Sequence, residues 1–559
     1  MLWFVVGAFV VLGAGYHFYG RWIAARYALD DERVTPAARF SDGVDFVPTR
    51  PFYLLGQHFS AIAAAGPIAG PILACQQFGW LPCVLWIGLG VVFIGAVHDF
   101  STLVASVRHD GRSIAEIVKQ QIGPRAWLAM TAFIWLALVY VIVAFTDITA
   151  STFVSGDADL AGLEMQFNPG GAVAAASTAY LGLALAMGAV EKWLRPKLWI
   201  QTLIFVPATL GAVWFGTQVS AWLLFDVKTW VVVILLYCFA ASVMPVWSLL
   251  QPRGYLGGFV LYLALAAGVA GVLLGGFEVQ QPAFRGFVVE GKTGPVSLFP
   301  FLFVTIACGA CSGFHGLVCS GTTSKQIAKE SHCRAVGYGA MLLEAFVAIL
   351  ALATVLIVRP EAIAGKAPGA IYGEGLGRFL AVVLGQDLLA FSVTFGAMAF
   401  STFVFDTLDV TTRLGRYLLQ ELIFGSSRAG ALAATAATIG VPALFLLNSG
   451  PMAYLKYWPL FGTSNQLLAA LSLLGVTVWL RRTGKPFWFT ALPAAALFAI
   501  TLTALISQIG SSASAPPAPE SIANGVAGAL LLLLALTMLV LGLRRLLTDS
   551  SQLAKRSHG

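Results

Sequence analysis

The sequence predicts an all-α protein that crosses a membrane many times, and two observations carry this prediction. The chain has 559 residues, of which 58% are hydrophobic and only 11% are charged, and its mean hydropathy is +0.83. Soluble domains carry roughly 25% charged residues. The chain also contains fifteen apolar runs, each close to the roughly 20 residues that a helix needs to cross a bilayer. We therefore expect a polytopic fold of about fifteen transmembrane helices.

The predicted spans share an apolar middle and polar ends, and we place them at roughly 2–20, 54–76, 81–106, 126–150, 171–190, 198–221, 229–250, 255–276, 298–320, 335–358, 388–411, 429–447, 458–480, 486–508 and 523–543. With the N-terminus outside, 26 of the 33 Lys and Arg residues fall in inside loops and 7 in outside loops. Positive charge gathers on the cytoplasmic side of membrane proteins. The sequence thus predicts an external N-terminus and a cytoplasmic C-terminus.

The chain reads as a single transmembrane domain over 1–559, with a core at about 45–475 and peripheral helices at 1–24 and 486–543. Two outside connections, at about 277–297 and 359–387, are polar and long enough for small lids or surface helices. Inside, residues 112–122 place apolar side chains at helical spacing, which predicts an amphipathic helix on the membrane surface.

The second span holds an unusual break, because residues 57–71 read QHFSAIAAAGPIAGP. Pro67 and Pro71 each remove a backbone N–H and clash with the preceding turn, while Gly66 and Gly70 permit close approach. Irregular backbone at membrane depth is tolerated only where it is buried in protein or lines a cavity. A broken helix carrying a titratable group, here His58, is typical of the substrate site of secondary transporters.

The ninth span is a second interrupted helix and runs in the opposite direction. It reads FLFVTIACGACSGFHGLVCSGTT, in which Gly309, Gly313 and Gly316 interrupt the apolar run and His315 lies beside them. Two interrupted spans of opposite direction are what an inverted-topology repeat produces. The span around Pro245 is a rival for the matching half. Alternatively, GACSG is a small-residue packing face.

Ionisable groups within a span are costly and are functional candidates by default. His58 could bind a proton or a substrate carboxylate, or be an interfacial histidine bonded to backbone. Asp99 could pair with a cation or with His58, or lie at a solvated helix end. Glu344 lies mid-span, too far from either end to reach water, and must be paired, protonated or facing a cavity.

The eleventh span carries a second set of charges. Asp409 and Arg413 have the i,i+4 spacing of a local ion pair, which leaves Asp406, one turn earlier, the less compensated carboxylate. We interpret Asp147 and His98 as solvated groups near span ends. Asn465 and Gln466, the polar pair in FGTSNQ, could complete a cavity.

Other chemistry finds little support. Cys308, Cys311, His315 and Cys319 have the spacing of metal ligands, but they lie in a Gly-rich apolar span, so we expect no metal and no cofactor. The net charge of +7 is spread over short loops, which argues against nucleic-acid binding. The chain has neither GxxxxGK[ST] nor GxSxG, so ATP drive and hydrolase chemistry are disfavoured. Energy would then come from an ion gradient.

At these same residues the chain resembles the carbon-starvation protein A (CstA) family of bacterial transporters. The similar stretches follow in order from about 45 to 475 and are GQHFSAIAAAGPIAGPILA (56–74), GAVHDF (95–100), SVMPVWSLLQPRGYL (242–256), FPFLFVTIACGACSGFHGLVCSGTTSKQIAKE (299–330), VGYGAMLLEAFVAI (336–349), LDVTTRLGRYLLQEL (408–422) and WPLFGTSNQLLAA (458–470). The resemblance implies an inner-membrane importer of peptides or pyruvate, used when carbon is scarce, with a LeuT-type inverted-repeat core.

The chain also departs from the family pattern. Family members usually begin the first broken helix with two histidines, and here Gln57 stands at the first. Asp409 matches a family aspartate, whereas Asp406 stands where a neutral residue is usual. Cys311 and Cys319 are also peculiar to this chain. The 359–387 connection is compact where large members carry a long insertion, so substrate preference does not transfer.

Together these observations predict an ion-coupled importer, driven by protons rather than sodium, for pyruvate or short peptides. Free N–H groups after the first break would face the substrate carboxylate. We assign substrate binding to Gln57, His58, Gly66, Gly70, Gly309, Gly313, His315, Asn465 and Gln466, and coupling or gating to Asp99, Glu344, Asp406, Asp409 and Arg413. The alternative is a membrane sensor that binds a metabolite without moving it, and an enzyme is third. The expected partners are the substrate and the lipid bilayer, and the oligomeric state stays open.

Overall fold

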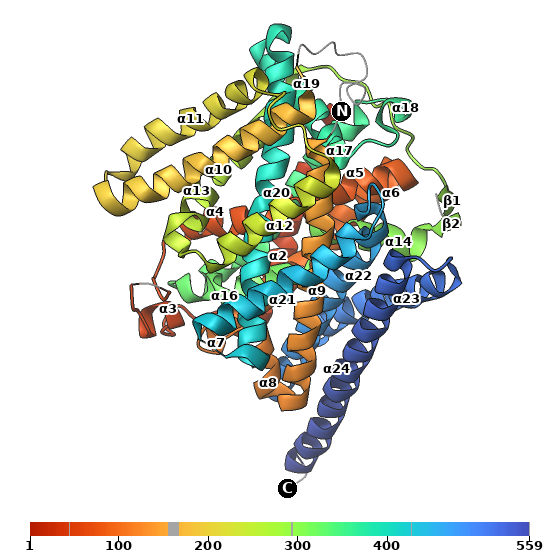
Figure 1. The fold of residues 1–559 in the computed structure, drawn as a ribbon. Coiled ribbons are helices and arrows are strands. Elements are labelled where there is room, and N and C mark those ends of the chain that lie inside the picture. The colour runs from red at the N-terminus through yellow and green to blue at the C-terminus, as the bar shows by residue number, and fades with distance from the viewer. Residues whose placement is uncertain (44, 155–166, 292–293, 426, 558–559) are drawn as a thin grey trace.

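The computed structural model describes residues 1–43, 45–154, 167–291, 294–425 and 427–557, with side chains described to residue 548. It is a bundle of long helices with the two termini at opposite ends (Figure 1). Among the described residues, twelve helices are long and apolar enough to cross a membrane. They are α1–α2 (Leu2–Tyr27, joined by a π-helical turn), α6–α7 (Trp80–Arg108, likewise), α9 (Pro124–Phe153), α10 (Pro169–Leu194), α11 (Leu198–Gln218), α13 (Leu250–Leu274), α17 with its preceding turn (Arg334–Leu356), α20 with flanking turns (Gln386–Phe424), α21 (Arg428–Leu447), α22 (Tyr454–Arg482), α23 (Trp488–Ser514) and α24 (Pro519–Ser557).

The three other predicted spans are also helical, but none is one straight span-length helix. Helices α4 (Pro51–Ile62) and α5 (Gly66–Phe78) form a pair bent by 47° and count as a thirteenth span if taken together. Helix α12 (Val227–Val243) has 17 residues. Residues 298–321 form α14 (Leu298–Thr305), α15 (Ala307–Ala310) and α16 (Gly313–Gly321). The polytopic all-α class is confirmed, and the count of fifteen stays a prediction.

Several helices begin where the local sequence favours a helix start. The side chains of Asn168, Asp226 and Ser427 each accept a hydrogen bond from a backbone N–H in the following turn, which satisfies a donor that the first turn leaves free. Pro124 and Pro169 occupy the first turn of α9 and α10, a position where their missing N–H costs nothing.

The connections hold short elements, and two of them differ from prediction. The outside connection at 277–297 contains an antiparallel hairpin of β1 (Val288–Gly291) and β2 (Gly294–Ser297). Helix α8 (Ile114–Gln121) is the predicted amphipathic helix, but its apolar side chains are buried against α9 and α22. The remaining short helices are α3 (Pro36–Arg39), α18 (Pro360–Ile363) and α19 (Pro368–Leu384).

Helix α19 corrects the expectation of a lid or surface helix at 359–387, because most of it is buried. Gly373 and Gly377 lie against α20, where a Cβ would come within 2.8 Å of Ala397 and 2.6 Å of Val393. Small residues at four-residue spacing let two helix backbones approach closely. Close packing at these glycines therefore explains why the predicted connection contains a buried helix.

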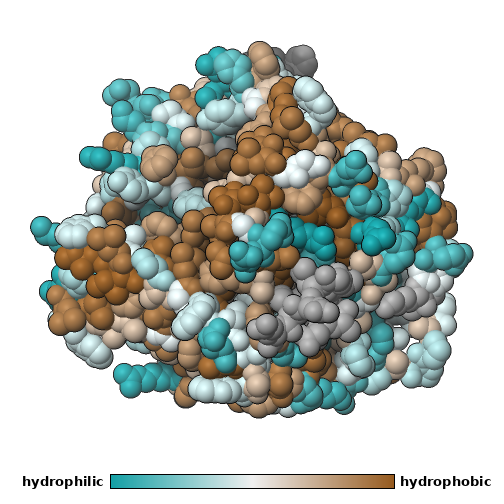
Figure 2. All heavy atoms as spheres, turned by 90° about the horizontal axis from the view of Figure 1, so that it is seen from above, coloured by the Kyte–Doolittle hydropathy of each residue, from teal (hydrophilic) through white to brown (hydrophobic). Residues whose placement is uncertain are grey.

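The surface is apolar over wide areas. Seen from above, hydrophobic side chains cover much of the molecule and hydrophilic ones gather in separate patches (Figure 2). On α24, for example, Val526, Leu530 and Leu533 are all exposed. Apolar exposure of this extent marks contact with lipid or protein, as the predicted bilayer partner requires.

Candidate functional site: two broken helices and a buried acid–imidazole row

The first helix break lies slightly earlier than the sequence predicts. Helix α4 ends at Ile62 and α5 begins at Gly66, so the break occupies 63–65 and not the Gly-Pro steps of 66–71. Pro67 is in the first turn of α5, where proline fits. Pro71 lies inside α5 without ending it. The break places buried His58 at the end of one half-helix and Gly66 at the start of the other.

The second break is double. The chain leaves helical geometry at Ile306 and again at Cys311 and Ser312, the latter two in extended conformation. Helix α16 then begins at Gly313, with His315 in its first turn. The ninth span is thus interrupted as predicted, but not at the predicted residues, because Gly309, Gly313 and Gly316 lie inside α15 and α16.

Helix α22 supplies the hydrogen bonds that the double break leaves open. The Asn465 side-chain oxygen accepts from the N–H of Phe314 at 2.9 Å, at the start of α16. The Gln466 amide donates to the carbonyl of Phe303 at 2.9 Å, just before the first interruption. Free backbone groups at helix ends require such partners when buried. In this structure Asn465 and Gln466 therefore act as caps for the broken helix.

The glycines assigned to close approach bring the two broken helices together. A Cβ at Gly70 would lie 2.7 Å from the carbonyl oxygen of Thr305, and one at Gly66 would collide with Cys308. A Cβ at Gly309 would lie 2.8 Å from Ala348 of α17. One at Gly313 would collide with the backbone of α22. The breaks at 63–65 and 306–312 are thus direct neighbours in space.

A row of ionisable side chains joins α7, α16 and α17 beside these breaks. His315 of α16 is placed with its Nδ1 2.9 Å from Oδ2 of Asp99 in α7 and its Nε2 3.1 Å from Oε2 of Glu344 in α17. His98 extends the row, with its Nδ1 2.7 Å from the second Asp99 oxygen. All four side chains are at most 1% exposed. We call Asp99, His315 and Glu344 the acid–imidazole row.

The structure thus joins three residues that the sequence named separately. Asp99 pairs with two histidines, neither of which is His58. His98 is fully buried, so its interpretation as a solvated group is wrong, and the reason is that α7 is packed on both sides at this level. Asp147 is also buried, contrary to expectation, since its carboxylate accepts from the N–H of Tyr454 at the start of α22 at 2.7 Å.

His58 lies beside the row and belongs to a different hydrogen bond. Its Nδ1 is 2.8 Å from the hydroxyl of Thr323, which follows α16, and its Nε2 is 3.7 Å from the Cys319 sulfur. Gln57, the adjacent predicted substrate residue, is exposed and lies apart from this group. Among the residues the structure describes, no three His, Cys, Asp or Glu side chains are placed as metal ligands.

A second buried charge cluster corrects the predicted pairing in α20. Arg253 of α13 contacts Asp406 at 2.6 Å and Asp409 at 3.1 Å through the same nitrogen. Tyr237 of α12 donates to Asp409 at 2.8 Å. We call Arg253, Asp406 and Asp409 the arginine cluster. Asp406 is therefore not the less compensated carboxylate, because both aspartates share one guanidinium.

The predicted Asp409–Arg413 ion pair is wrong. Arg413 instead donates to the carbonyl oxygens of Ala241 and Met244 at 2.7 and 2.8 Å, at the end of α12. The i,i+4 spacing permits that pair, but α12 offers Arg413 free helix-end carbonyls and α13 offers Asp409 a buried cation.

Sequence reasoning missed Arg253, which was counted as an inside-loop charge. Its side chain is 0% exposed. Its position in the first turn of an apolar span could have identified it, since a carboxylate within a span requires a paired cation. Thr323 and Tyr237 gave no such signal, because neutral hydroxyl side chains are common in membrane helices.

A many-helix apolar bundle with two broken helices and ionisable side chains at their breaks defines a secondary transporter of the membrane. The chain belongs to the carbon starvation protein CstA family, whose pattern it matches over residues 1–374 and 360–504. Family membership confirms the resemblance drawn from the motifs.

The named relatives are transporters and not enzymes. The chain is 34% identical to the peptide transporter CstA of Escherichia coli (strain K12), over 90% of this chain and 80% of that one. It is 32% identical to the pyruvate/proton symporter BtsT of the same organism, over 90% and 81% of the two chains. A crystal structure of the Eremococcus coleocola manganese transporter is similar at a TM-score of 0.45 and 14% identity, covering 90% of this chain and 98% of that one.

Proposed function

We propose that this protein imports pyruvate or short peptides across the bacterial inner membrane by proton symport. The observation that carries the proposal is the acid–imidazole row, which lies at the point where the two broken helices meet. Its ion pairs join carboxylates to histidines alone. Histidine gains or loses a proton near neutral pH, so the row can hold different numbers of protons during a transport cycle.

Protons suit this site better than sodium. A sodium ion needs several oxygen ligands, whereas the oxygens of Asp99 and the nearer oxygen of Glu344 already face histidine nitrogens. A proton needs one acceptor. The pyruvate/proton symporter among the relatives supports the same ion. Both named substrate classes, pyruvate and peptides, carry a carboxylate, which would bind near His58 and the positive end of the α5 dipole. The predicted free N–H groups are fewer than expected, because Pro67 has none and Ile68 and Ala69 both donate to the carbonyl of Ala65.

Two halves of the chain repeat the same order of elements, which supports a LeuT-type inverted repeat. The broken pair α4–α5 is followed by α6–α7, the short helix α8 and the long helix α9. The broken helix α14–α16 is followed by α17, the helix α19 and the long helix α20. The contacts are reciprocal as well, since α17 packs on α5 and α7 packs on α16. This favours 298–320 over the Pro245 region as the partner of 54–76, because Pro245 lies in the connection between the separate helices α12 and α13.

The whole chain would act as one transmembrane domain, with α1–α2, α23 and α24 peripheral to the core. The positive-inside pattern supports an external N-terminus and a cytoplasmic C-terminus, and the termini lie at opposite ends of the bundle (Figure 1). No observation on this molecule favours the alternative, a sensor that binds a metabolite without transport.

Uptake into proteoliposomes tests the proposal. Labelled pyruvate and labelled dipeptides are offered separately under an inward proton gradient, an inward sodium gradient and no gradient. We expect accumulation of one substrate class above equilibrium with the proton gradient, and its loss when a protonophore is added. Accumulation that ignores the proton gradient would rule out proton symport, and binding without uptake would favour the sensor.

A further inference from the structure

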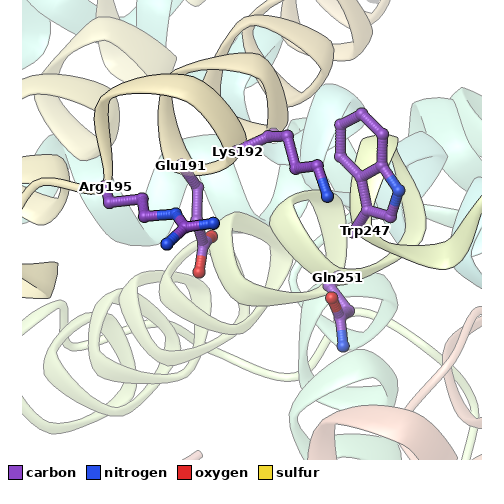
Figure 3. Close-up of a pocket in the computed structure, with 6 residues that line it drawn as sticks. Glu191, Lys192, Arg195, Trp247 and Gln251 are labelled. Atoms are coloured by element: carbon purple, nitrogen blue, oxygen red, sulfur yellow. The ribbon is translucent and has the colours of Figure 1, made fainter.

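A pocket at the end of the α10–α11 hairpin shares no lining residue with the acid–imidazole row or with the predicted substrate-binding residues. It is lined by residues from the last turns of α10, the turn before α13 and the first turn of α13, namely Gly188, Glu191, Lys192, Arg195, Trp247 and Gln251 (Figure 3). The basic residues place it in a predicted inside loop.

The charges of this pocket are open to a ligand. Lys192 Nζ lies 5.3 Å from the centre of the Trp247 ring. Among the described side chains, neither Lys192 nor Arg195 makes an ion pair. Glu191 is the single carboxylate in the lining. The pocket thus carries a net charge of one positive unit. The Arg195 side chain lies on the Glu191 side of the pocket and the Lys192 side chain on the Trp247 side (Figure 3).

The surroundings of the pocket are those of a membrane interface. Trp193 and Trp199 are 77% and 60% exposed, and Leu194 and Leu198 are exposed beside them. Tryptophan is enriched where bilayer hydrocarbon meets the headgroups. Basic pockets between transmembrane helices on the cytoplasmic side bind anionic lipid headgroups.

We propose that this pocket binds the headgroup of a singly charged anionic phospholipid from the cytoplasmic leaflet. The phosphodiester lies between Lys192 and Arg195, whose charges it attracts, while Gln251 and Glu191 hydrogen-bond polar groups of the headgroup. The acyl chains pack against the exposed apolar side chains of α10 and α11. A headgroup of higher negative charge is disfavoured because Glu191 repels it.

Native mass spectrometry of the purified full chain tests this, with added phosphatidylglycerol or phosphatidylcholine as the lipid. We expect the wild type to retain one phosphatidylglycerol in preference to phosphatidylcholine. The double variant K192Q/R195Q should bind phosphatidylglycerol roughly 30-fold more weakly, because each basic residue near an anionic lipid surface contributes about a fivefold gain. Glu191→Gln should strengthen binding, since it removes the only repelling charge in the lining.

Arg26→Gln is the matched control. Arg26 is an exposed cation that lies over the Trp22 ring at 4.6 Å, it belongs to another predicted inside loop, and it does not line the pocket. We expect Arg26→Gln to leave lipid retention unchanged. Equal losses in Arg26→Gln and K192Q/R195Q, or no loss in K192Q/R195Q, would overturn the proposal. So would displacement of the lipid by millimolar inorganic phosphate, which would make the pocket a site for a free anion.

Discussion

The acid–imidazole row and the arginine cluster are both buried, and both contain two carboxylates around one cation-forming side chain. They differ in that side chain. In the row it is His315, whose imidazole can be either neutral or positively charged. In the cluster it is Arg253, whose guanidinium stays protonated in proteins. The row includes a residue beside a helix break, since His315 lies in the first turn of α16, whereas the cluster joins the intact helices α13 and α20, with Tyr237 of α12 attached.

In the mechanism we propose, the row exchanges protons and the cluster holds helices in place. Asp99, His315 and Glu344 would then share a changing number of protons without leaving their positions. Arg253 cannot lose its charge, so the two aspartates must stay near it or the contact must break. We therefore expect variants of the row to impair coupling, and variants of the cluster to impair stability.

The largest effect on transport is expected from Glu344→Gln, which keeps the shape of the side chain and removes its proton chemistry. Uptake driven by a proton gradient should fall roughly 100-fold, the scale on which a positioned acid or base matters. Exchange of labelled for unlabelled substrate at equal pH should persist, because exchange requires no net proton movement. Both rates are measured in proteoliposomes.

If Glu344→Gln accumulated substrate as the wild type does, the row would have no part in coupling. Loss of exchange together with uptake would make Glu344 a structural residue, like those of the cluster, and would break the comparison. His98→Gln tests the Asp99 side of the row separately, because His98 contacts Asp99 but not Glu344.

The next effect concerns the stability of the arginine cluster. Arg253→Gln leaves the buried Asp409 and the partly buried Asp406 without their cation, and breaking a buried pair costs about 3–5 kcal/mol. We expect a clear drop in the melting temperature of the purified protein in detergent. Adding Asp406→Asn to Arg253→Gln should recover part of the loss, because one uncompensated charge is then removed.

If Arg253→Gln melts like the wild type but loses proton-driven uptake, the cluster takes part in coupling and the division of roles fails. Arg413→Gln provides a contrast on the same helix. Its guanidinium donates to two backbone carbonyls and pairs with no carboxylate in the described residues, so its replacement leaves no anion unpaired and should cost less.

Much of the fold follows from the sequence, because hydropathy locates the apolar helices and the glycine and proline steps indicate which spans are broken. The exact positions of the breaks do not follow, since the chain leaves helical geometry at 63–65 and at Ile306, Cys311 and Ser312. The ninth span is an example, with its interruption beside His315. The partners of individual charges do not follow, because they depend on how each helix is rotated. Asp409 has Arg413 on its own helix, yet its buried cation is Arg253 of α13, 156 residues earlier in the chain.

The same limit applies within the site. Asp99, His315 and Glu344 could each be named as costly intramembrane charges, but the sequence does not state that three helices bring them into one row. Asn465 and Gln466 were predicted to complete a cavity as the polar pair in FGTSNQ, and this role stays a prediction. Their hydrogen bonds to the broken helix could not be predicted, because only the contacts across α22 reveal them.

The smallest effect comes from a third charge cluster, which lies outside the spans and gives a reference for the two buried ones. Glu330 pairs with Arg108 at 2.8 Å and Arg33 at 3.0 Å, and the N–H of Asp30 donates to it at 3.0 Å. Burial by itself would raise the pKa of Glu330, but the hydrogen bonds from Arg108 and Asp30 hold it below its ordinary value. A lowered carboxyl pKa adds stability above the unfolded value, about pH 4.3, and this stability is lost as the pH falls through the lower, folded pKa.

Wild type and Glu330→Gln should therefore differ in melting temperature at pH 6 and converge at acidic pH. Hydrogen bonds to charged groups contribute about 1.5–3 kcal/mol, so the difference at pH 6 should be smaller than that for Arg253→Gln. Asp110→Asn, which breaks the exposed Arg39–Asp110 pair, is the control and should change little, since exposed pairs contribute about 0–1 kcal/mol. A difference between wild type and Glu330→Gln that stays constant down to acidic pH would mean that the carboxylate charge is not what holds this cluster. Glu330 would then stabilise the protein by packing. The contrast between a charge that changes with pH and one that stays fixed would hold only within the spans.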